Sequence, residues 1–225
     1  MGSVAKLLNK DMDSAMLELK FRRALDIATG ERNLRKRELH VSDFTGSDRE
    51  FCFKRLLLRY YKGEEAYRTS YVQFDGKWRE EKWMVLMKAG KFLREYQPAL
   101  KVGRLSGHPD FIVDFGKGVC VIELTGYDSK IDPVLRNARL SVKKRQCLLY
   151  MVMWWKMKGE RPYRGFVIAE NKGNCEFKIV PVDWDAEKAA TLVKRVTMTS
   201  KIIDALDARK GSAEARAKVW RIVPR

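Results

Sequence analysis

Two acidic residues stand near the far ends of a predicted β-hairpin. The stretch from Gly107 to Gly126 reads GHPDFIVDFGKGVCVIELTG, in which two strand-like runs flank a Gly-Lys-Gly turn. Asp110 opens the first run and Glu123 closes the second. The two positions are mirror images about the turn, so antiparallel pairing brings them to the same end of the ladder.

Facing carboxylates of this kind need a positive partner. They repel each other by roughly 1 kcal/mol or more, depending on solvation, and a divalent cation between them removes that cost. Oxygen ligands suit Mg²⁺ or Mn²⁺, and such an ion polarises a phosphodiester and lowers the pKa of an attacking water molecule. For an isolated Asp–Glu pair, two solvated strand ends are the simpler explanation, so the surrounding residues must decide.

Further motifs precede and follow the hairpin along the chain. Gln146 and Tyr150 lie four residues apart and share one face of a predicted helix. The remaining motifs are Ser42-Asp43-Phe44, the basic and aromatic run of residues 49–55, GKWREE at residues 76–81, Gly107-His108-Pro109-Asp110 and Glu123-Leu124-Thr125. In this order and spacing, residues 40–182 resemble the PD-(D/E)xK nuclease superfamily, and within it the RecB-like exonuclease branch that includes the nuclease of CRISPR adaptation.

The resemblance implies a metal centre beside a helix that holds DNA. The helix face with Gln146 and Tyr150 would point to the active site. His108 shares strand parity with Asp110, which makes it a candidate ligand, with a local hydrogen bond as the alternative role. The residues that would hold Mg²⁺ or Mn²⁺ are Asp110, Glu123, the backbone carbonyl of Leu124, Glu80 or Glu81, and His108.

Three departures from the family's pattern matter. Thr125 stands where the signature has a lysine, and a hydroxyl carries no positive charge to stabilise the phosphate. Glu80 stands where the branch has a histidine ligand, and a glutamate suits Mg²⁺ or Mn²⁺ better than imidazole does. No cysteine follows Cys175, so the cysteine cluster of the iron–sulfur members is missing and we predict no iron–sulfur cluster.

The missing lysine leaves two interpretations. Either the enzyme is weakened or inactive, or another cation has taken the role. Lys143 precedes Gln146 by three residues and shares its helix face, although a solvated or phosphate-facing lysine is its ordinary explanation. Lys117 and Lys130 are poorer candidates, because Lys117 lies in the turn at the opposite end of the hairpin and Lys130 in a loop beyond the strand.

The charge of the chain points to a polyanionic partner. Its 225 residues carry a formal net charge of +17, and 45% of them are hydrophobic. The apolar share supports a folded core. The charge favours nucleic acid, with an anionic membrane surface or an acidic protein partner as weaker candidates. No apolar run reaches the roughly 18 residues of a membrane span and no secretory signal is recognised, so we expect a cytoplasmic location, in the host cytoplasm if the protein is virus-encoded.

Basic residues on two predicted helices are the expected contacts to DNA phosphates. Exposed aromatic side chains can stack on unpaired bases, but Trp78, Trp83, Trp154 and Trp155 are expected mainly in the core. No base-reading motif is recognised, so sequence-specific recognition is not predicted. The predicted DNA-binding residues are Arg49, Lys54, Arg55, Arg59, Lys143, Lys144 and Arg145.

The hydrophobic patterns predict an α/β fold, a restriction-endonuclease-like core with a central mixed β-sheet flanked by helices, plus an N-terminal helical extension. Predicted helices cover residues 4–29, 47–61, 74–96, 131–159 and 185–208, and predicted strands cover residues 99–105, 110–115, 119–124, 164–170 and 175–182. The expected divisions are residues 1–40 for the N-terminal helix and basic linker, 41–210 for the nuclease-like domain and 211–225 for a basic tail. Four widely spaced cysteines predict neither a zinc site nor a disulfide framework.

The predicted function is a Mg²⁺- or Mn²⁺-dependent deoxyribonuclease that acts on single- or double-stranded DNA ends. It would be an exonuclease of DNA processing or recombination, encoded by a phage or mobile element, with its activity reduced or altered by Thr125. The main alternative is a non-catalytic DNA-binding protein on the same fold. Two weaker possibilities are an interaction protein with an acidic partner and a restriction-type endonuclease that cuts circular DNA.

Overall fold

The computed structural model describes residues 32–33, 38–47, 51–62, 67–68, 71–127 and 138–208. The chain divides into two compact units, residues 1–35 with 65–79 and residues 36–64 with 80–225. The elements in chain order are β1 (Arg32–Asn33), β2 (Leu39–His40), the 3₁₀ helix η1 (Val41–Phe44), α2 (Phe53–Lys62), β3 (Tyr67–Arg68), α3 (Tyr71–Ala89), β4 (Leu93–Tyr96), β5 (Leu100–Val102), β6 (Leu105–Gly107), β7 (Phe111–Asp114), β8 (Val119–Tyr127), α5 (Ala138–Lys158), β9 (Arg164–Asn171), β10 (Phe177–Val182) and α6 (Ala186–Asp207). The predicted α/β class is confirmed.

None of the helices in these ranges combines the length and apolar character that crossing a membrane requires.

The first unit contains a short pair of strands. β1 pairs with β3 in antiparallel register, with Arg32 opposite Arg68. The helix α3 begins in this unit and continues into the second at residue 80. The predicted N-terminal helix of residues 4–29 and the predicted tail of residues 211–225 lie outside the described residues.

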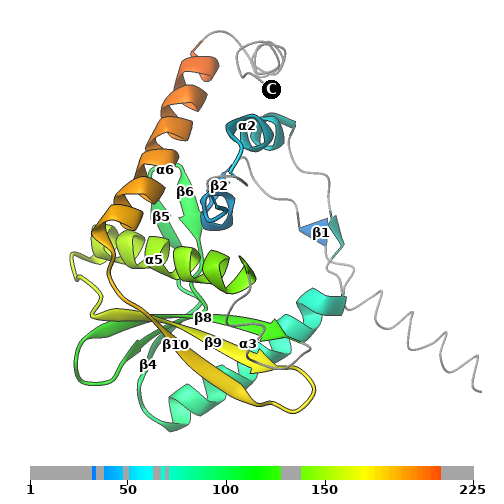
Figure 1. The fold of residues 1–225 in the computed structure, drawn as a ribbon, viewed down its shortest axis with the longest axis vertical. Helices are drawn as coiled ribbons and strands as arrows, with labels where there is room; N and C mark the ends of the chain where they lie inside the picture. The colour runs from blue at the N-terminus through cyan, green and yellow to red at the C-terminus, as the bar shows by residue number, and fades with distance from the viewer. Residues whose placement is uncertain are drawn as a thin grey trace, which may run out of the picture. The chain divides into compact units, whose positions relative to one another are not determined.

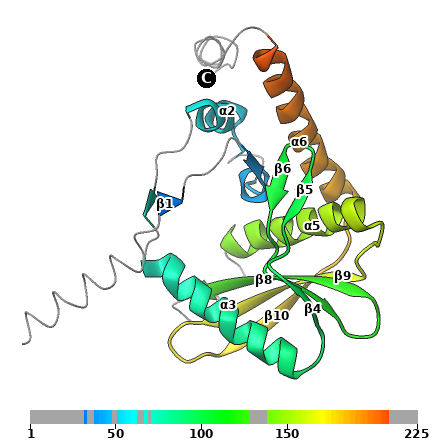
Figure 2. The ribbon, with the colours of Figure 1, turned by 180° about the vertical axis from the view of Figure 1, so that it is seen from behind.

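The central sheet lies in the second unit and has the strand order β10-β9-β8-β7-β4. β8 and β9 run parallel, whereas the other neighbours run antiparallel. Parallel neighbours need a long crossover connection, and the segment between β8 and β9 contains the 21-residue helix α5. Figure 1 and Figure 2 show α5 across one face of this sheet, and the part of α3 that belongs to the second unit lies along the other, where Trp83 and Met87 pack on the sheet.

β8 is buried along its whole length because both faces of the sheet are covered. Val121 belongs to the core cluster built with α5, whereas Ile122 belongs to the cluster built with Trp83 of α3. Side chains alternate between the two faces of a strand. Glu123 and Thr125 share the parity of Val121, so they face α5.

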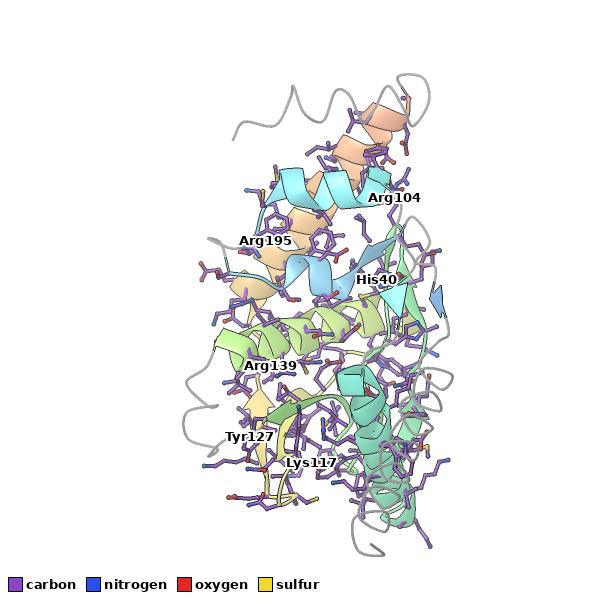
Figure 3. All side chains as sticks on the ribbon, turned by 90° about the vertical axis from the view of Figure 1, so that its right-hand side faces the viewer. His40, Arg104, Lys117, Tyr127, Arg139 and Arg195 are labelled. Carbon is purple, nitrogen blue, oxygen red and sulfur yellow. The ribbon has the colours of Figure 1, made fainter. Side chains whose placement is uncertain are left out.

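A second sheet, β2-β6-β5, joins the start of this unit to its last helix. β2 runs parallel to β6, and β5 runs antiparallel to it. Arg104, in the turn between β5 and β6, forms an ion pair with Asp204 of α6 at 2.7 Å and donates a hydrogen bond to the Tyr60 hydroxyl of α2 at 2.8 Å. Arg104 therefore ties the turn to both helices, at the position labelled in Figure 3.

Two predicted elements are divided in the structure. The predicted helix of residues 74–96 ends at Ala89, and its last four residues form β4 instead. Lys91 adopts a φ of 59°, a left-handed conformation that ends a helix and reverses the chain. The predicted strand of residues 99–105 is split into β5 and β6 at Gly103, whose φ is also 59°.

Burial was predicted correctly for some tryptophans and wrongly for others. Trp83 and Trp154 are buried as expected, but Trp78 is 67% exposed and Trp155 is 41% exposed. Both exposed residues lie on helices whose buried positions are occupied by other side chains. Cys120 and Cys147 are buried free thiols, as their apolar surroundings predicted.

Candidate active site

The β7–β8 hairpin brings the two acidic residues together in the predicted register. Phe111 pairs with Ile122, so Asp110 and Glu123 occupy the next position of the same ladder. The Leu124 N–H donates a hydrogen bond to Asp110 Oδ2 at 2.6 Å, which fixes the orientation of that carboxylate. The Glu123 side chain is only 1% exposed.

Lys143 of α5 completes a three-residue cluster with these carboxylates. Its Nζ lies 2.8 Å from Glu123 Oε2, and its side chain is 23% exposed. Lys143 is therefore not a freely solvated lysine in this structure, because its ammonium pairs with a buried carboxylate. The helix crosses the sheet face on which Glu123 lies, and this crossing brings the lysine to the acidic pair.

Burial and charge shift the pKa values of all three groups. Burial, followed by repulsion from Asp110, raises the pKa of Glu123 to about 8, against the opposing effect of Lys143. Burial also raises the pKa of Asp110, although Lys143 and the Leu124 N–H act in the other direction. For Lys143 burial would lower the pKa, but the charges of Glu123 and Asp110 outweigh it and the pKa is raised.

Two polar atoms in the site are buried without a hydrogen-bond partner. They are Glu123 Oε1 and Thr125 Oγ1, on the same face of β8. An unsatisfied buried polar group costs about 1–3 kcal/mol, so these atoms mark a place where a bound ion or water is favoured.

The donor set fits a divalent cation with open water positions. In an extended strand the N–H and C=O of one residue point toward the same neighbour, so the Leu124 carbonyl faces the β7 side, where Asp110 lies. Together with Asp110 and Glu123 it supplies the oxygen ligands that Mg²⁺ and Mn²⁺ prefer, and such ions usually keep several waters. Within the described residues no group of three or more His, Cys, Asp or Glu side chains could hold a metal ion.

The other predicted ligands are near this site but not gathered into it. Glu80 accepts a hydrogen bond from Gln97 Nε2, and His108 Nδ1 lies 3.3 Å from the Gln97 carbonyl oxygen. The pKa of Tyr96 is raised by burial and then by the charges of Glu80, Glu81 and Asp110. All three carboxylates therefore lie close enough to Tyr96 for their charges to act on its hydroxyl.

Gln97 is a residue that the sequence analysis missed. Its N–H donates to the Asp110 carbonyl oxygen at 3.1 Å, and its φ of 45° is left-handed, an uncommon conformation for a residue with a side chain. Its side chain and carbonyl contact Glu80 and His108, respectively. Nothing in its local sequence signals this role, because the contacts join residues 80, 97, 108 and 110.

Tyr150, on the predicted Gln146–Tyr150 helix face, lies near enough to Glu123 for the charge of that carboxylate to act on it. Burial and then the charge of Glu123 raise the pKa of Tyr150, partly offset by a hydrogen bond with Gln146. The Tyr150 ring packs against the backbone of Gly107, where an added Cβ would lie 2.7 Å from Tyr150 Cε1. The glycine of the Gly107–Asp110 motif thus makes room for the tyrosine of the helix motif.

The predicted DNA-binding residues divide into two groups. Lys144 and Arg145 face away from the carboxylates and line a pocket of about 830 Å³ between α5 and α6. Arg145 Nε donates to the Thr45 carbonyl oxygen. Arg195, labelled in Figure 3, donates from the other side of the pocket to the Phe44 carbonyl oxygen at 3.0 Å. Arg49 and the side chains of Lys54, Arg55 and Arg59 lie outside the described part of the chain.

Comparisons with known proteins find likeness in structure only. No protein-family model and no curated protein sequence matches this chain. The crystal structure of an alkaline exonuclease from Laribacter hongkongensis aligns with a TM-score of 0.50 at 10% identity, over 77% of this chain and 93% of the exonuclease. Its complex with dAMP aligns at 0.49 and 10% identity, over 83% and 91% of the two chains. SSO0001 aligns at 0.49 and 15% identity, over 84% and 86%.

This chain shares its fold with the alkaline exonuclease. The alignment to the alkaline exonuclease covers most of both chains, and the mixed central sheet with helices on both faces is the restriction-endonuclease-like arrangement that the PD-(D/E)xK signature predicted. At 10% identity the likeness establishes the fold alone, and activity has to be argued from the site.

Proposed function

We propose that this protein is a metal-dependent deoxyribonuclease in which Lys143 takes the place of the signature lysine. The observation that carries the proposal is the distance of 2.8 Å between Lys143 Nζ and Glu123 Oε2. A cation supplied by α5 reaches the acidic pair that the hairpin assembles. The nuclease fold of the chain supports the same conclusion.

Each side chain of the cluster has a distinct task in this proposal. Asp110 and Glu123 would hold Mg²⁺ or Mn²⁺ with the Leu124 carbonyl, and the bound ion would supply Lewis-acid polarisation of the phosphodiester. The Lys143 ammonium stabilises negative charge that develops on the phosphate. The unpartnered Thr125 hydroxyl on the same face can donate to or accept from a water molecule, which orients that water next to the lysine.

DNA is the proposed substrate. The net charge of +17 attracts a polyanion, and Lys144 and Arg145 add further cations on another face of α5. Attack from DNA ends, in DNA processing or recombination, is the mode that the RecB-like resemblance supports. The same resemblance supports a phage or mobile-element origin.

One observation favours a second candidate, a non-catalytic DNA-binding protein. Thr125 lacks the charge of the signature lysine, and Lys143 pairs directly with Glu123. If this ion pair persists when DNA binds, the lysine neutralises a metal ligand instead of acting on the phosphate.

The proposal is tested by digestion of end-labelled linear DNA, single- and double-stranded, beside covalently closed circular DNA. The unaltered chain and Glu123→Ala are compared in Mn²⁺, Mg²⁺ and EDTA. Cleavage of linear DNA that disappears in EDTA and in Glu123→Ala is the expected result, and intact circles would assign the activity to ends. Salt-sensitive DNA binding with no cleavage in either metal would favour the non-catalytic protein.

A further inference from the structure

A cluster of two indoles and one guanidinium lies at the C-terminal end of α5. Trp155 is 41% exposed, and its ring centroid lies 5.5 Å from that of Trp184, with the two planes at 80°. Arg161 places its guanidinium carbon 4.8 Å from the Trp184 centroid and 5.8 Å from the Trp155 centroid. The site proposed for catalysis uses none of these three residues.

The guanidinium of Arg161 has no carboxylate partner within the described part of the chain, and the ammonium of the exposed Lys156 has none there either. Neighbouring arginines differ, because Arg94 pairs with Glu160 at 2.9 Å and Arg164 pairs with Asp183 at 2.6 Å. The indole pair therefore carries positive charge that no described carboxylate neutralises.

The cluster is remote from the acidic pair but rigidly connected to it. Trp155 follows Lys143 by 12 positions on the same helix, and at 1.5 Å per residue this separates them by about 18 Å along the axis. Figure 1 shows the start of α6 beside the C-terminal end of α5, which is the end away from Lys143. A nucleic-acid strand bound in the active site therefore reaches the indoles only with bases that lie several nucleotides further along the strand.

We infer that Trp155, Trp184 and Arg161 form a stacking platform for unpaired bases of single-stranded nucleic acid. An exposed aromatic face next to an uncompensated cation is the combination that binds a base and its phosphate together. A duplex does not offer such a face, because its bases are stacked inside. A proline-rich peptide could use the indoles but gains nothing from Arg161 and Lys156, whereas a polyanion does. The inference rests on the proposed function in one respect, that the ligand is nucleic acid.

The test measures binding of a fluorescein-labelled oligo-dT and of a mixed-sequence duplex of equal length by fluorescence anisotropy. EDTA is present throughout, so cleavage does not intervene. Trp155→Ala should weaken oligo-dT binding about tenfold, the effect of losing one stacked base, and leave duplex binding within about twofold. Trp155→Phe should restore most of the affinity, because it keeps an aromatic face. Phe115→Ala is the matched control, since Phe115 is 51% exposed and also lies in the second unit.

Photocrosslinking with 5-iododeoxyuridine in the unaltered chain gives a readout that no folding defect can affect. The crosslinked peptide should contain Trp155 or Trp184. Unchanged oligo-dT affinity in Trp155→Ala, an equal loss for duplex, or crosslinks confined to other peptides would each overturn the platform. Because binding is measured without metal, absent cleavage beside a selective loss in Trp155→Ala would overturn the nuclease proposal alone.

Discussion

At the scale of single residues, the proposed site divides between two side chains the tasks that one lysine serves in the PD-(D/E)xK signature. Thr125 retains a hydroxyl at the signature position, and Lys143 brings the charge from a neighbouring helix. The two side chains reach the site from different elements, so each can be removed without moving the other's backbone. This makes the division of labour testable one residue at a time.

The raised pKa of Glu123 predicts a specific pH dependence of stability in metal-free protein. Its pKa rises from the ordinary 4.5 to about 8 in the folded chain, so between these values the folded state binds more protons than the unfolded state. The free energy of unfolding therefore falls as pH rises through this window. Glu123→Gln removes this contribution. The difference in unfolding free energy between the unaltered chain and Glu123→Gln should therefore change by at most about 1.4 kcal/mol per pH unit.

Urea unfolding in EDTA at several pH values between 5 and 8 measures this difference. Mn²⁺ at the upper end of the range should stabilise the unaltered chain and leave Glu123→Gln unaffected. Parallel stability curves for the two proteins across the window would contradict the assigned shift.

Sequence reasoning located the acidic pair but not its surroundings. Asp110 and Glu123 are placed opposite each other by a short turn and by the alternation of side chains along each strand. Both are local properties of the chain. The contacts of Gln97 with Glu80 and His108 join three separate segments. Only tertiary packing decides such contacts, and no local pattern records them.

At the scale of elements, the position of Lys143 depends on how closely α5 packs on the sheet. Gly165 of β9 allows this approach, because an added Cβ would lie 2.5 Å from Cys147 Sγ and 2.9 Å from Met151 Sδ. Both neighbours belong to α5. The helix and the strand therefore meet at a glycine, about one turn beyond the lysine.

Gly165→Ala should both destabilise the protein and weaken cleavage. Forcing a methyl group into this contact costs about 1–3 kcal/mol, and it pushes α5 away from the sheet that carries Glu123. Gly76→Ala is the control, because no atom lies within 4 Å of an added Cβ there and alanine is the better helix former. Thermal unfolding and single-turnover cleavage on both variants check the prediction, and a Gly165→Ala protein with unaltered melting temperature and rate would refute it.

Elements with a long apolar periodicity were predicted correctly, whereas a boundary that depends on one chain-reversing residue was not. The hairpin strands, α5 and α6 follow apolar patterns that span many residues. The division between α3 and β4 depends on the left-handed conformation of Lys91, a residue type with no preference for it. A lysine at that position does not predict the end of a helix.

At the scale of the whole molecule, the net charge of +17 predicts steep salt dependence of DNA binding. Each phosphate neutralised by a lysine or arginine releases about one counterion, so affinity should fall about 10³–10⁵-fold between 50 and 200 mM salt if 6–10 phosphates are contacted. Anisotropy titrations of a duplex in increasing KCl measure the slope. A flat dependence would point instead to an acidic protein partner.

The central claim is that Lys143 supplies the charge that Thr125 cannot. The measurement that tests it most directly is the single-turnover cleavage rate of linear DNA in Mn²⁺ for Lys143→Ala, with Lys201→Ala, which removes an exposed lysine of α6, as the charge-matched control. Removing a charge that stabilises the transition state should slow cleavage about 10²–10³-fold, whereas Lys201→Ala should leave the rate nearly unchanged. Adding Thr125→Lys to Lys143→Ala should restore much of the rate by returning a cation to the signature position. A Lys143→Ala protein that cleaves as fast as the unaltered chain would contradict the account.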